Sequence, residues 1–370
     1  MRKTLWALAV LWIVMACTTT GGTALATGSS GSSWSPRAGL AVVGNHLVTD
    51  GGRTVRLLGV HKEGLDYKCL YDGAGYYDGP SDQASVDAMK TWNINAVRVA
   101  VSESCWLNSH GVASGGLGYR RAVLDYVNLL RANGLFVIID DHSSTDGVLP
   151  ALGLPMPSSQ AIAFWTSAAA AMRSIPGVVF DAYNEPHGIS WNCWRDGCYV
   201  PAGNDGEQDY RGYYAVGMQD LVLAIRSAGA TQPILLGGLD FARDDSGWES
   251  HLPIDPLGQL IAAEHNYGPI GNDKGNDCVD SCLDVLAHIA RHHPVMFGEV
   301  GQSGCTHEYV DNQMQWADEH GIGYIAFTWN AIAPDGWTCD GPSLITDYDG
   351  TPSGYGVGVR DHLQSIDTSP

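Results

Sequence analysis

The chain has 370 residues, of which 45% are apolar and 16% are charged, so it can form a substantial core and wholesale disorder is excluded. Twenty Lys and Arg residues stand against 40 Asp and Glu residues, which gives a formal net charge of −20. A basic nucleic-acid footprint is therefore absent, and an anionic membrane surface would repel the chain. At about 100–200 residues per domain, the length fits one large domain or two modest ones.

Residues 1–26 have the pattern of a secretory signal peptide. Two basic residues precede an apolar stretch over residues 5–16, which is too short to span a bilayer comfortably. A small-x-small cleavage site follows at residues 24–26. We therefore expect a secreted protein.

The remainder of the chain predicts a short leader and one domain. Residues 27–35 are rich in Ser and Gly and predict a flexible leader, and residues 36–370 predict a single domain. The segment Val14-Met15-Ala16-Cys17 loosely resembles a lipoprotein box. Lipid anchoring through Cys17 is therefore the second possibility for the mature N-terminus.

Eight short apolar runs predict strands. Residues 40–60 predict a short β-hairpin, with Asp50-Gly51-Gly52 as its turn, that leads into the first of them. Most runs are continuous rather than alternating, which is typical of strands buried on both faces. The predicted strands cover residues 55–60, 96–101, 135–140, 178–183, 233–236, 260–265, 295–299 and 323–328.

Helical patterns separate many of these runs. Val123, Tyr126, Val127 and Leu130 lie at positions i, i+3, i+4 and i+7, and Gly134 ends that helix. This alternation predicts an α/β fold, a (β/α)8 TIM barrel. A doubly wound sheet is the alternative, but its glycine-rich turn does not follow the first strand. Further helices are expected over residues 159–174, 208–228, 281–293 and 308–320.

Two glutamates end predicted strands on opposite sides of such a barrel. Glu185 ends the fourth strand and Glu299 ends the seventh, and functional groups of these barrels lie at the C-terminal ends of strands. Either glutamate alone could be a solvated turn residue. Together they favour glycoside cleavage, which uses paired carboxylates around an oxocarbenium-like transition state.

Six further strand-end residues fit this chemistry. The arginine and the tyrosine could hold Glu299 ionised, the asparagine could hydrogen-bond a sugar hydroxyl, and the histidines could bind hydroxyls or tune the acid. The tryptophan offers an apolar face for a sugar ring. Each also has a structural interpretation, as an ion-pair arginine, a packing histidine or a core tryptophan. The six are Arg98, His142, Asn184, His265, Tyr267 and Trp329.

These motifs resemble family 5 of the glycoside hydrolases, the cellulase family, and the chain looks like a secreted bacterial member. The resemblance spans roughly residues 40–365, and its strength lies in the order of the motifs on successive strands. The matching stretches are Arg56-Leu57-Leu58-Gly59-Val60, Asn95-Ala96-Val97-Arg98-Val99, residues 134–142, Tyr183-Asn184-Glu185-Pro186, His265-Asn266-Tyr267, Gly298-Glu299 and Thr328-Trp329-Asn330.

The resemblance implies a retaining β-glycosidase of the endo-β-1,4-glucanase type, acting on plant oligo- or polysaccharide without a metal or organic cofactor. It implies that Glu185 is the acid/base and Glu299 the nucleophile, and that the six residues named above occupy common active-site positions. No appended carbohydrate-binding module is expected, and a monomer is assumed. An exo-acting β-glycosidase or diglycosidase, a β-mannanase and a non-catalytic carbohydrate-binding barrel remain alternatives.

The cysteines favour disulfides, because eight besides Cys17 form an even set in an exported chain. The resemblance suggests a bond between Cys69 and Cys105, which would leave Cys305 and Cys339 for each other. The sequence alone does not fix the pairing. A structural zinc site is the alternative, but no Cys-x-x-Cys pair recurs at zinc-site spacing. Two further pairs are close in sequence, namely Cys193 with Cys198 and Cys278 with Cys282.

The substrate is left open by departures from the family pattern. Many relatives carry Asp-Leu-His-Trp where this chain has Asp140-Asp141-His142-Ser143. Relatives often carry Arg-Val-Pro where it has Arg98-Val99-Ala100. Tryptophans in expected loops could form sugar platforms, namely Trp106, Trp191, Trp194, Trp248 and Trp337.

Overall fold

The structure, a computed structural model, describes residues 39–206, 208–268, 281–331 and 342–367. The predicted signal peptide and leader, residues 1–35, lie outside the described residues. Within the described ranges, no helix combines the length and the apolar character that a membrane crossing needs.

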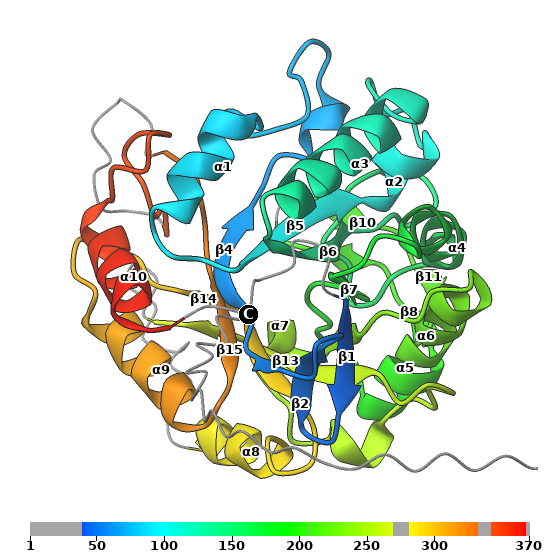
Figure 1. Ribbon diagram of the computed structural model, residues 1–370. Coiled ribbons are helices and arrows are strands. Elements are labelled where there is room, and N and C mark those ends of the chain that lie inside the picture. The colour runs from blue at the N-terminus through cyan, green and yellow to red at the C-terminus, as the bar shows by residue number, and fades with distance from the viewer. Residues whose placement is uncertain (1–38, 207, 269–280, 332–341, 368–370) are drawn as a thin grey trace, which may run out of the picture. The chain divides into compact units, whose positions relative to one another are not determined.

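Eight parallel strands close into a barrel, so the predicted (β/α)8 fold is confirmed (Figure 1). Each strand pairs with the barrel strand that precedes it in the chain, and the last pairs with the first. The barrel strands are β4 (Leu58–Lys62), β5 (Ala96–Ser102), β6 (Phe136–Ser143), β7 (Val178–Asp181), β12 (Ile234–Gly237), β13 (Leu260–Tyr267), β14 (Val295–Gly301) and β15 (Gly323–Ala326).

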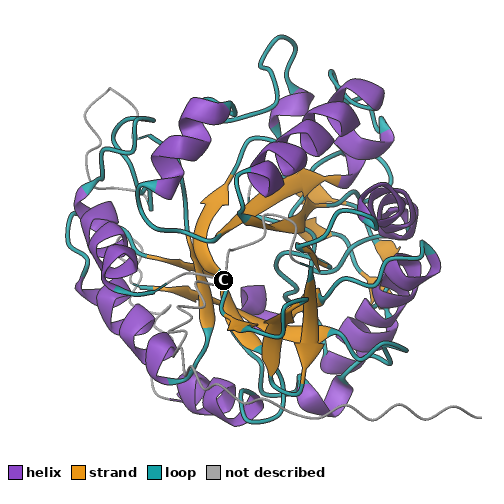
Figure 2. Cartoon of the chain, in the orientation of Figure 1, coloured by secondary structure: helices purple, strands orange, loops and turns teal. Residues whose placement is uncertain are grey.

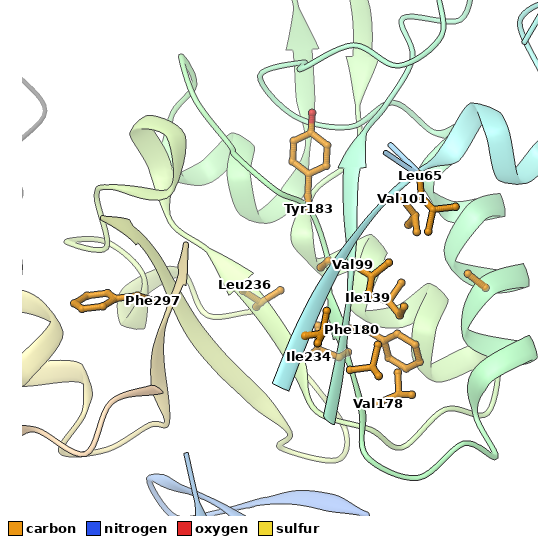
Figure 3. Packing of buried hydrophobic residues seen from close by; sticks show 14 of the residues in the cluster. Leu65, Val99, Val101, Ile139, Val178, Phe180, Tyr183, Ile234, Leu236 and Phe297 are labelled. Atoms are coloured by element: carbon orange, nitrogen blue, oxygen red, sulfur yellow. The ribbon is translucent and has the colours of Figure 1, made fainter. Parts of the chain in front are cut away.

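Side chains of these strands alternate between two apolar clusters. Ile138, Val179 and Leu235 belong to a cluster inside the barrel. Their neighbours on the same strands, such as Ile139 and Phe180, belong to the larger cluster beneath the surrounding helices, where Figure 3 shows them packed together. Both faces are therefore buried, which is why the strands read as continuous apolar runs.

A three-stranded antiparallel sheet covers the N-terminal end of the barrel, where a hairpin was expected. Its strands are β1 (Leu40–Val43), β2 (His46–Thr49) and β3 (Thr54–Val55). The predicted Asp50-Gly51-Gly52 turn joins the second to the third. Because Val55 pairs with Leu47 in this sheet, the first barrel strand begins at Leu58 rather than at residue 55.

Most of the helices surround the barrel on the outside (Figure 2). The four core positions predicted around Val123 are all buried in α3. Capping fixes some of the starts, since Asp82 accepts a hydrogen bond from Ser85 N (3.0 Å) at the start of α1. The helices are α1 (Gln83–Lys90), α2 (Glu103–Leu107), α3 (Leu117–Ala132), α4 (Gln160–Met172), α5 (Trp191–Asp196), α6 (Met218–Ser227), α7 (Leu239–Ala242), α8 (Ser281–Ile289), α9 (Glu308–Glu319) and α10 (Gly354–Ser365), with short 3-10 turns η1 (Lys68–Leu70) and η2 (Glu249–His251).

The helix predicted over residues 208–228 is wrong in its first half. Short strands occupy that half: β10 (Asp209–Tyr210) pairs with β9 (Gly203–Asn204), and β11 (Tyr213–Ala215) pairs with β8 (Cys198–Val200). Gly217 then packs so closely that a Cβ there would lie 2.2 Å from the carbonyl oxygen of Arg195. Cross-strand pairing of tyrosines and this close approach override the local helical pattern.

The suggested Cys69–Cys105 disulfide is confirmed, and Cys193 is bonded to Cys198. Cys282 and Cys305 are also disulfide-bonded. The cysteines expected opposite them, Cys278 and Cys339, lie outside the described residues.

Candidate active site

Arg98 lies at the centre of a polar layer above the inner apolar cluster. It follows Ala96, which faces the barrel interior, by two residues on β5. Its Nε donates to Asp181 Oδ2 (2.9 Å) and its Nη1 to Glu299 Oε1 (2.6 Å), while Nη2 forms an ion pair with Asp140 Oδ1 (3.0 Å). The guanidinium is fully buried. These charge-assisted contacts therefore fix its orientation.

A bulge in β14 turns Glu299 toward the Arg98 guanidinium. The register against β13 shifts so that Glu264 pairs with Phe297 and His265 with Glu299, which leaves Gly298 as the extra residue. Phe297 packs in the outer cluster, and the extra residue brings Glu299 to the inner face. A Cβ at position 298 would lie 3.1 Å from His265 Nε2, so glycine permits the ring to approach.

The environment of Glu299 holds its carboxylate in the ionised form. The Tyr267 hydroxyl donates to Oε2, and His265 Nδ1 lies 3.6 Å from the same atom. Burial would raise the pKa of Glu299, but the charges of His265 and Arg98 hold that pKa well below its usual range. Burial and the charge of Glu299 raise the pKa of Tyr267, so the phenol remains a donor.

Glu185 lies just beyond β7 and faces Glu299. Pro186 follows it and disfavours a helical backbone there. The Glu185 side chain is 33% exposed, and its Oε1 lies 2.9 Å from His265 Nδ1. One oxygen of each carboxylate and a nitrogen of His265 lie within 4.8 Å of one another. Direct attack by one carboxylate requires a spacing of about 5–5.5 Å, whereas activation of an intervening water requires about 6.5–9.5 Å.

Two histidines and an asparagine complete the layer. His142 Nδ1 lies 2.6 Å from Asp140 Oδ2; burial opposes protonation of this ring, but Asp140 raises its pKa to about 10. Burial lowers the pKa of His61, whose Nδ1 lies 3.1 Å from Arg98 Nη1. Asn184 Oδ1 accepts from Arg98 Nη2 (2.9 Å), so the amide NH2 group is the part that can donate to a ligand.

Two overlapping groups here have the spacing of metal ligands: His61 with His142 and Glu299, and Glu185 with His265 and Glu299. Neighbouring carboxylates raise the pKa of both His142 and His265. A metal ion would therefore have to compete with a proton for both of these rings.

The structure does not place Trp329 where a sugar could stack on it. Its indole is fully buried and meets Trp92 edge-on, with ring centroids 4.9 Å apart. The aromatic ring that β15 delivers to the site is Phe327, which is half-buried. Its centroid lies 4.8 Å from that of His61 and 5.9 Å from that of Tyr267. Trp329 therefore belongs to the core.

Most of the loop tryptophans are also core residues. Trp106, Trp194 and Trp248 are buried, and their indole N–H groups donate to Ser167 Oγ, Gly237 O and Leu236 O. Trp191 is half-buried beside Trp194, and Trp337 lies outside the described residues. The N–H partners explain why these large side chains tolerate full burial.

Phe241, an exposed aromatic residue, lies beside the site and was not predicted from the sequence. It is 39% exposed, stacks on His187 with centroids 4.1 Å apart, and its N–H donates to Pro186 O (3.0 Å). Asp240, Phe241 and Ala242 all have positive φ, between 55° and 63°. Consecutive left-handed residues of this kind are costly and cluster at functional sites.

Asp140, Asp181 and His61 were also missed as site residues. The available signal was a charged or polar side chain inside an otherwise apolar run, as in Val178-Val179-Phe180-Asp181. Ionisable groups are seldom fully buried unless paired, so such a residue predicts a buried partner. No comparable signal marks Phe241, because its exposure depends on the backbone conformation after β12.

Comparison with known proteins gives a family for most of the chain. The family model described as cellulase (glycosyl hydrolase family 5) matches residues 52–332. Endoglucanase CelA of Streptomyces lividans is 23% identical over 350 residues, which cover 90% of this chain and 65% of that protein. The chain covers smaller shares of the other endoglucanases that it matches.

Two solved structures share the fold across most of the chain. The catalytic domain of a mannanase from Streptomyces sp. SirexAA-E has a TM-score of 0.64 at 20% identity, covering 94% of this chain and 98% of that one. A β-glucanase from Saccharophagus degradans has a TM-score of 0.63 at 18% identity, covering 89% and 94%.

Proposed function

We propose that this chain, which belongs to the cellulase family (glycosyl hydrolase family 5), is a retaining endo-β-1,4-glucanase. The observation that carries the proposal is the carboxylate pair. Glu185 and Glu299 have oxygens within 4.8 Å of each other, and the surrounding charges keep Glu299 ionised. A spacing this short leaves little room for a water molecule between a sugar and a catalytic base, so it supports direct attack.

In the first step, Glu299 attacks the anomeric carbon while Glu185 protonates the departing glycosidic oxygen. The bond to the leaving sugar breaks as the glycosyl ester to Glu299 forms. Arg98 and Tyr267 hold the attacking carboxylate in place, each on one of its two oxygens. Their hydrogen bonds orient the nucleophile before substrate binds.

In the second step, Glu185 takes a proton from water, and the resulting hydroxide equivalent displaces Glu299 from the sugar. Two inversions at one carbon give net retention. His265, which contacts both carboxylates, is the positioning residue that links them. His142 and Asn184 each have a hydrogen-bond donor for sugar hydroxyls, and the half-buried Phe327 has an apolar face for the ring.

The choice of β-1,4-glucan is supported by the relatives named above. The matched sequences are endoglucanases, whereas the solved folds include both a mannanase and a β-glucanase. A β-mannanase with the same carboxylate pair is therefore the second candidate. A panel of polysaccharides separates the two candidates.

The test combines one substitution with a substrate panel. Glu299→Gln is expected to abolish turnover with little loss of stability, while Glu319→Gln, an exposed glutamate on α9, keeps wild-type turnover. Wild-type activity in Glu299→Gln would refute the mechanism. Early NMR spectra of the product should show the β-anomer, and an α-anomer would refute retention.

The panel contains a soluble cellulose derivative, mixed-linkage glucan, mannan, xylan and aryl diglycosides. A ladder of short gluco-oligosaccharides with falling viscosity supports the endoglucanase. Cleavage of mannan alone supports the mannanase, and a single mono- or disaccharide from the outset supports exo action. Oligosaccharide binding without any cleavage over days would indicate a carbohydrate-binding barrel.

Secretion is part of the same proposal, because a polysaccharide cannot enter a cell intact. We expect the signal peptide over residues 1–26 to be removed. Mass spectrometry of the protein recovered from culture medium should find Thr27 at the N-terminus. An acylated Cys17 on cell-associated protein would instead establish lipid anchoring.

A further inference from the structure

A second cluster of ionisable side chains lies outside the catalytic site. It consists of Glu249 in η2, His288 in α8, and His292 and His293 just after α8, and is called the histidine cluster below. His288 Nε2 lies 3.2 Å from Glu249 Oε2, and His292 Nδ1 lies 3.2 Å from Glu249 Oε1. His293 Nε2 lies 3.8 Å from the same Oε1. One potential ligand atom from each of Glu249, His288 and His292 lies within 4.8 Å of the others.

The backbone brings these side chains together without help from a ligand. His288 lies in the last turn of α8, and the chain continues in a helical turn in which His292 N donates to Ile289 O (2.9 Å). Two histidines four residues apart therefore lie on one face. Their ring centroids are 5.4 Å apart.

A buried tryptophan, Trp248, fixes the backbone next to Glu249. Trp248 has no exposed surface, and its indole N–H donates to Leu236 O of β12 (3.0 Å). The same indole meets the ring of His293 edge-on at 5.2 Å. The carboxylate thus projects from a fixed point toward the histidines rather than from a free loop.

We infer that the histidine cluster is a binding site for a divalent transition metal of the zinc class. Imidazole and carboxylate are ligands that such cations prefer, and three protein ligands with a water complete a tetrahedron. Metal–ligand bonds of about 2.0–2.2 Å at tetrahedral angles place ligand atoms about 3.3–3.5 Å apart. The two His–Glu separations of 3.2 Å, one to each oxygen of the Glu249 carboxylate, are close to this spacing, and a small rotation of the carboxylate would bring one oxygen between the two rings.

The surroundings allow a cation to enter. His288 and His292 are more than half exposed, and a hollow of about 370 Å³ opens beside His288 and Glu249. Asp284 also lines this hollow, one helical turn before His288, and adds negative charge. Arg291 contacts His288 Nδ1. The arginine is exposed, so its guanidinium can move aside when a cation binds.

A metal here would link two successive barrel units rather than take part in hydrolysis. Glu249 lies between β12 and β13, whereas α8 lies between β13 and β14. A bond network through one ion would tie these connections together on the outside of the barrel. Because a metal that binds only the folded form shifts the unfolding equilibrium, it should raise thermal stability.

The test uses the purified protein without a histidine tag, stripped with EDTA and titrated with ZnCl2 by calorimetry. We expect one high-affinity site, a higher unfolding temperature with zinc, and no response to MgCl2, since Mg²⁺ prefers oxygen ligands. His288→Gln and His292→Gln should each weaken zinc binding by about tenfold or more and remove the thermal effect. His46→Gln, an exposed histidine on β2, should change neither.

Three results would overturn the inference. One is the absence of zinc binding in the micromolar range, and another is zinc binding that raises no unfolding temperature. The third is zinc binding that persists in His288→Gln and His292→Gln, which would place the ion elsewhere. Zinc held by Glu185 and Glu299 would behave in this third way and would also inhibit hydrolysis. Both cluster variants are expected to keep normal activity without zinc, which controls for misfolding.

Discussion

Glu103→Gln should make the protein more stable at neutral and alkaline pH. Glu103 is the first residue of α2. Asp141 lies on β6 next to Asp140, which forms an ion pair with Arg98. Both carboxyl groups are fully buried and close enough for the charge of Glu103 to act on Asp141, so the pair is stable only when at least one of the two carboxyls holds a proton. Burial raises the pKa of Glu103 to about 8, and burial together with the charge of Glu103 raises that of Asp141.

The direction and the magnitude of this gain in stability follow from proton linkage. A carboxyl whose pKa is higher in the folded than in the unfolded chain binds more protons when folded, so stability falls as pH rises. The fall begins near 4.5, the ordinary pKa of glutamate, and ends near 8. The free energy of unfolding falls by up to about 1.4 kcal/mol per pH unit, so a rise from about pH 4.5 to about pH 8 lowers it by at most about 5 kcal/mol. A glutamine keeps the shape, donates to Asp141 and removes this cost.

The assay is urea unfolding followed by tryptophan fluorescence at pH 4.5, 6, 7 and 8. The difference in unfolding free energy between Glu103→Gln and wild type should be small at pH 4.5 and grow to several kcal/mol at pH 8. Glu319→Gln, an exposed glutamate, serves as the control and should show no such trend. A difference that stays constant across the series would refute the reasoning, because only the raised pKa of Glu103 makes the difference depend on pH.

Three further predictions concern the site and a disulfide. Tyr267→Phe removes one of the donors to Glu299 and should lower kcat about 10- to 100-fold with little change in KM, as steady-state kinetics would show; an unchanged kcat would contradict the role. Phe241→Ala removes an exposed ring near Glu185 and should raise KM for long oligosaccharides more than for an aryl glycoside; an equal effect on both substrates would contradict a sugar contact. Replacing Cys69 and Cys105 by alanine opens a loop of 36 residues and should cost about 4 kcal/mol in urea unfolding; a cost below about 1 kcal/mol would argue against it.

The barrel could be predicted because its strands are buried on both faces. Continuous apolar runs such as residues 96–101 are typical of such strands, and their alternation with helices leaves one main architecture. The helix predicted over residues 208–228 failed where Tyr213 pairs with Val200. That pairing joins residues 13 apart in the sequence, so a local period could not reveal it.

The site could be predicted where reactive side chains lie at the C-terminal ends of predicted strands. Glu185, Glu299, Arg98 and Tyr267 lie together because parallel strands deliver their C-terminal ends to one face. The inward turn of Glu299 depends on the bulge at Gly298, which a two-residue alternation does not foresee.

The aromatic residues were less predictable than the charged ones. Tryptophan is as much a core residue as a ligand platform, and only the structure shows which ring is buried. Trp329 is packed against Trp92, whereas Phe327, two residues earlier, lies near His61. Large amphipathic side chains serve either purpose, so sequence position alone does not separate them.

The small antiparallel sheet that precedes the barrel sets a practical limit on shortening the protein. Its side chains Leu40, Leu47 and Val55 share one apolar cluster with Phe136 and Ile138 inside the barrel, so they cover one end of that core. A truncated form that starts at the first barrel strand would expose this end of the core to water. Such a form should be recovered mainly in inclusion bodies, whereas trimming that stops before Leu40 should preserve soluble expression.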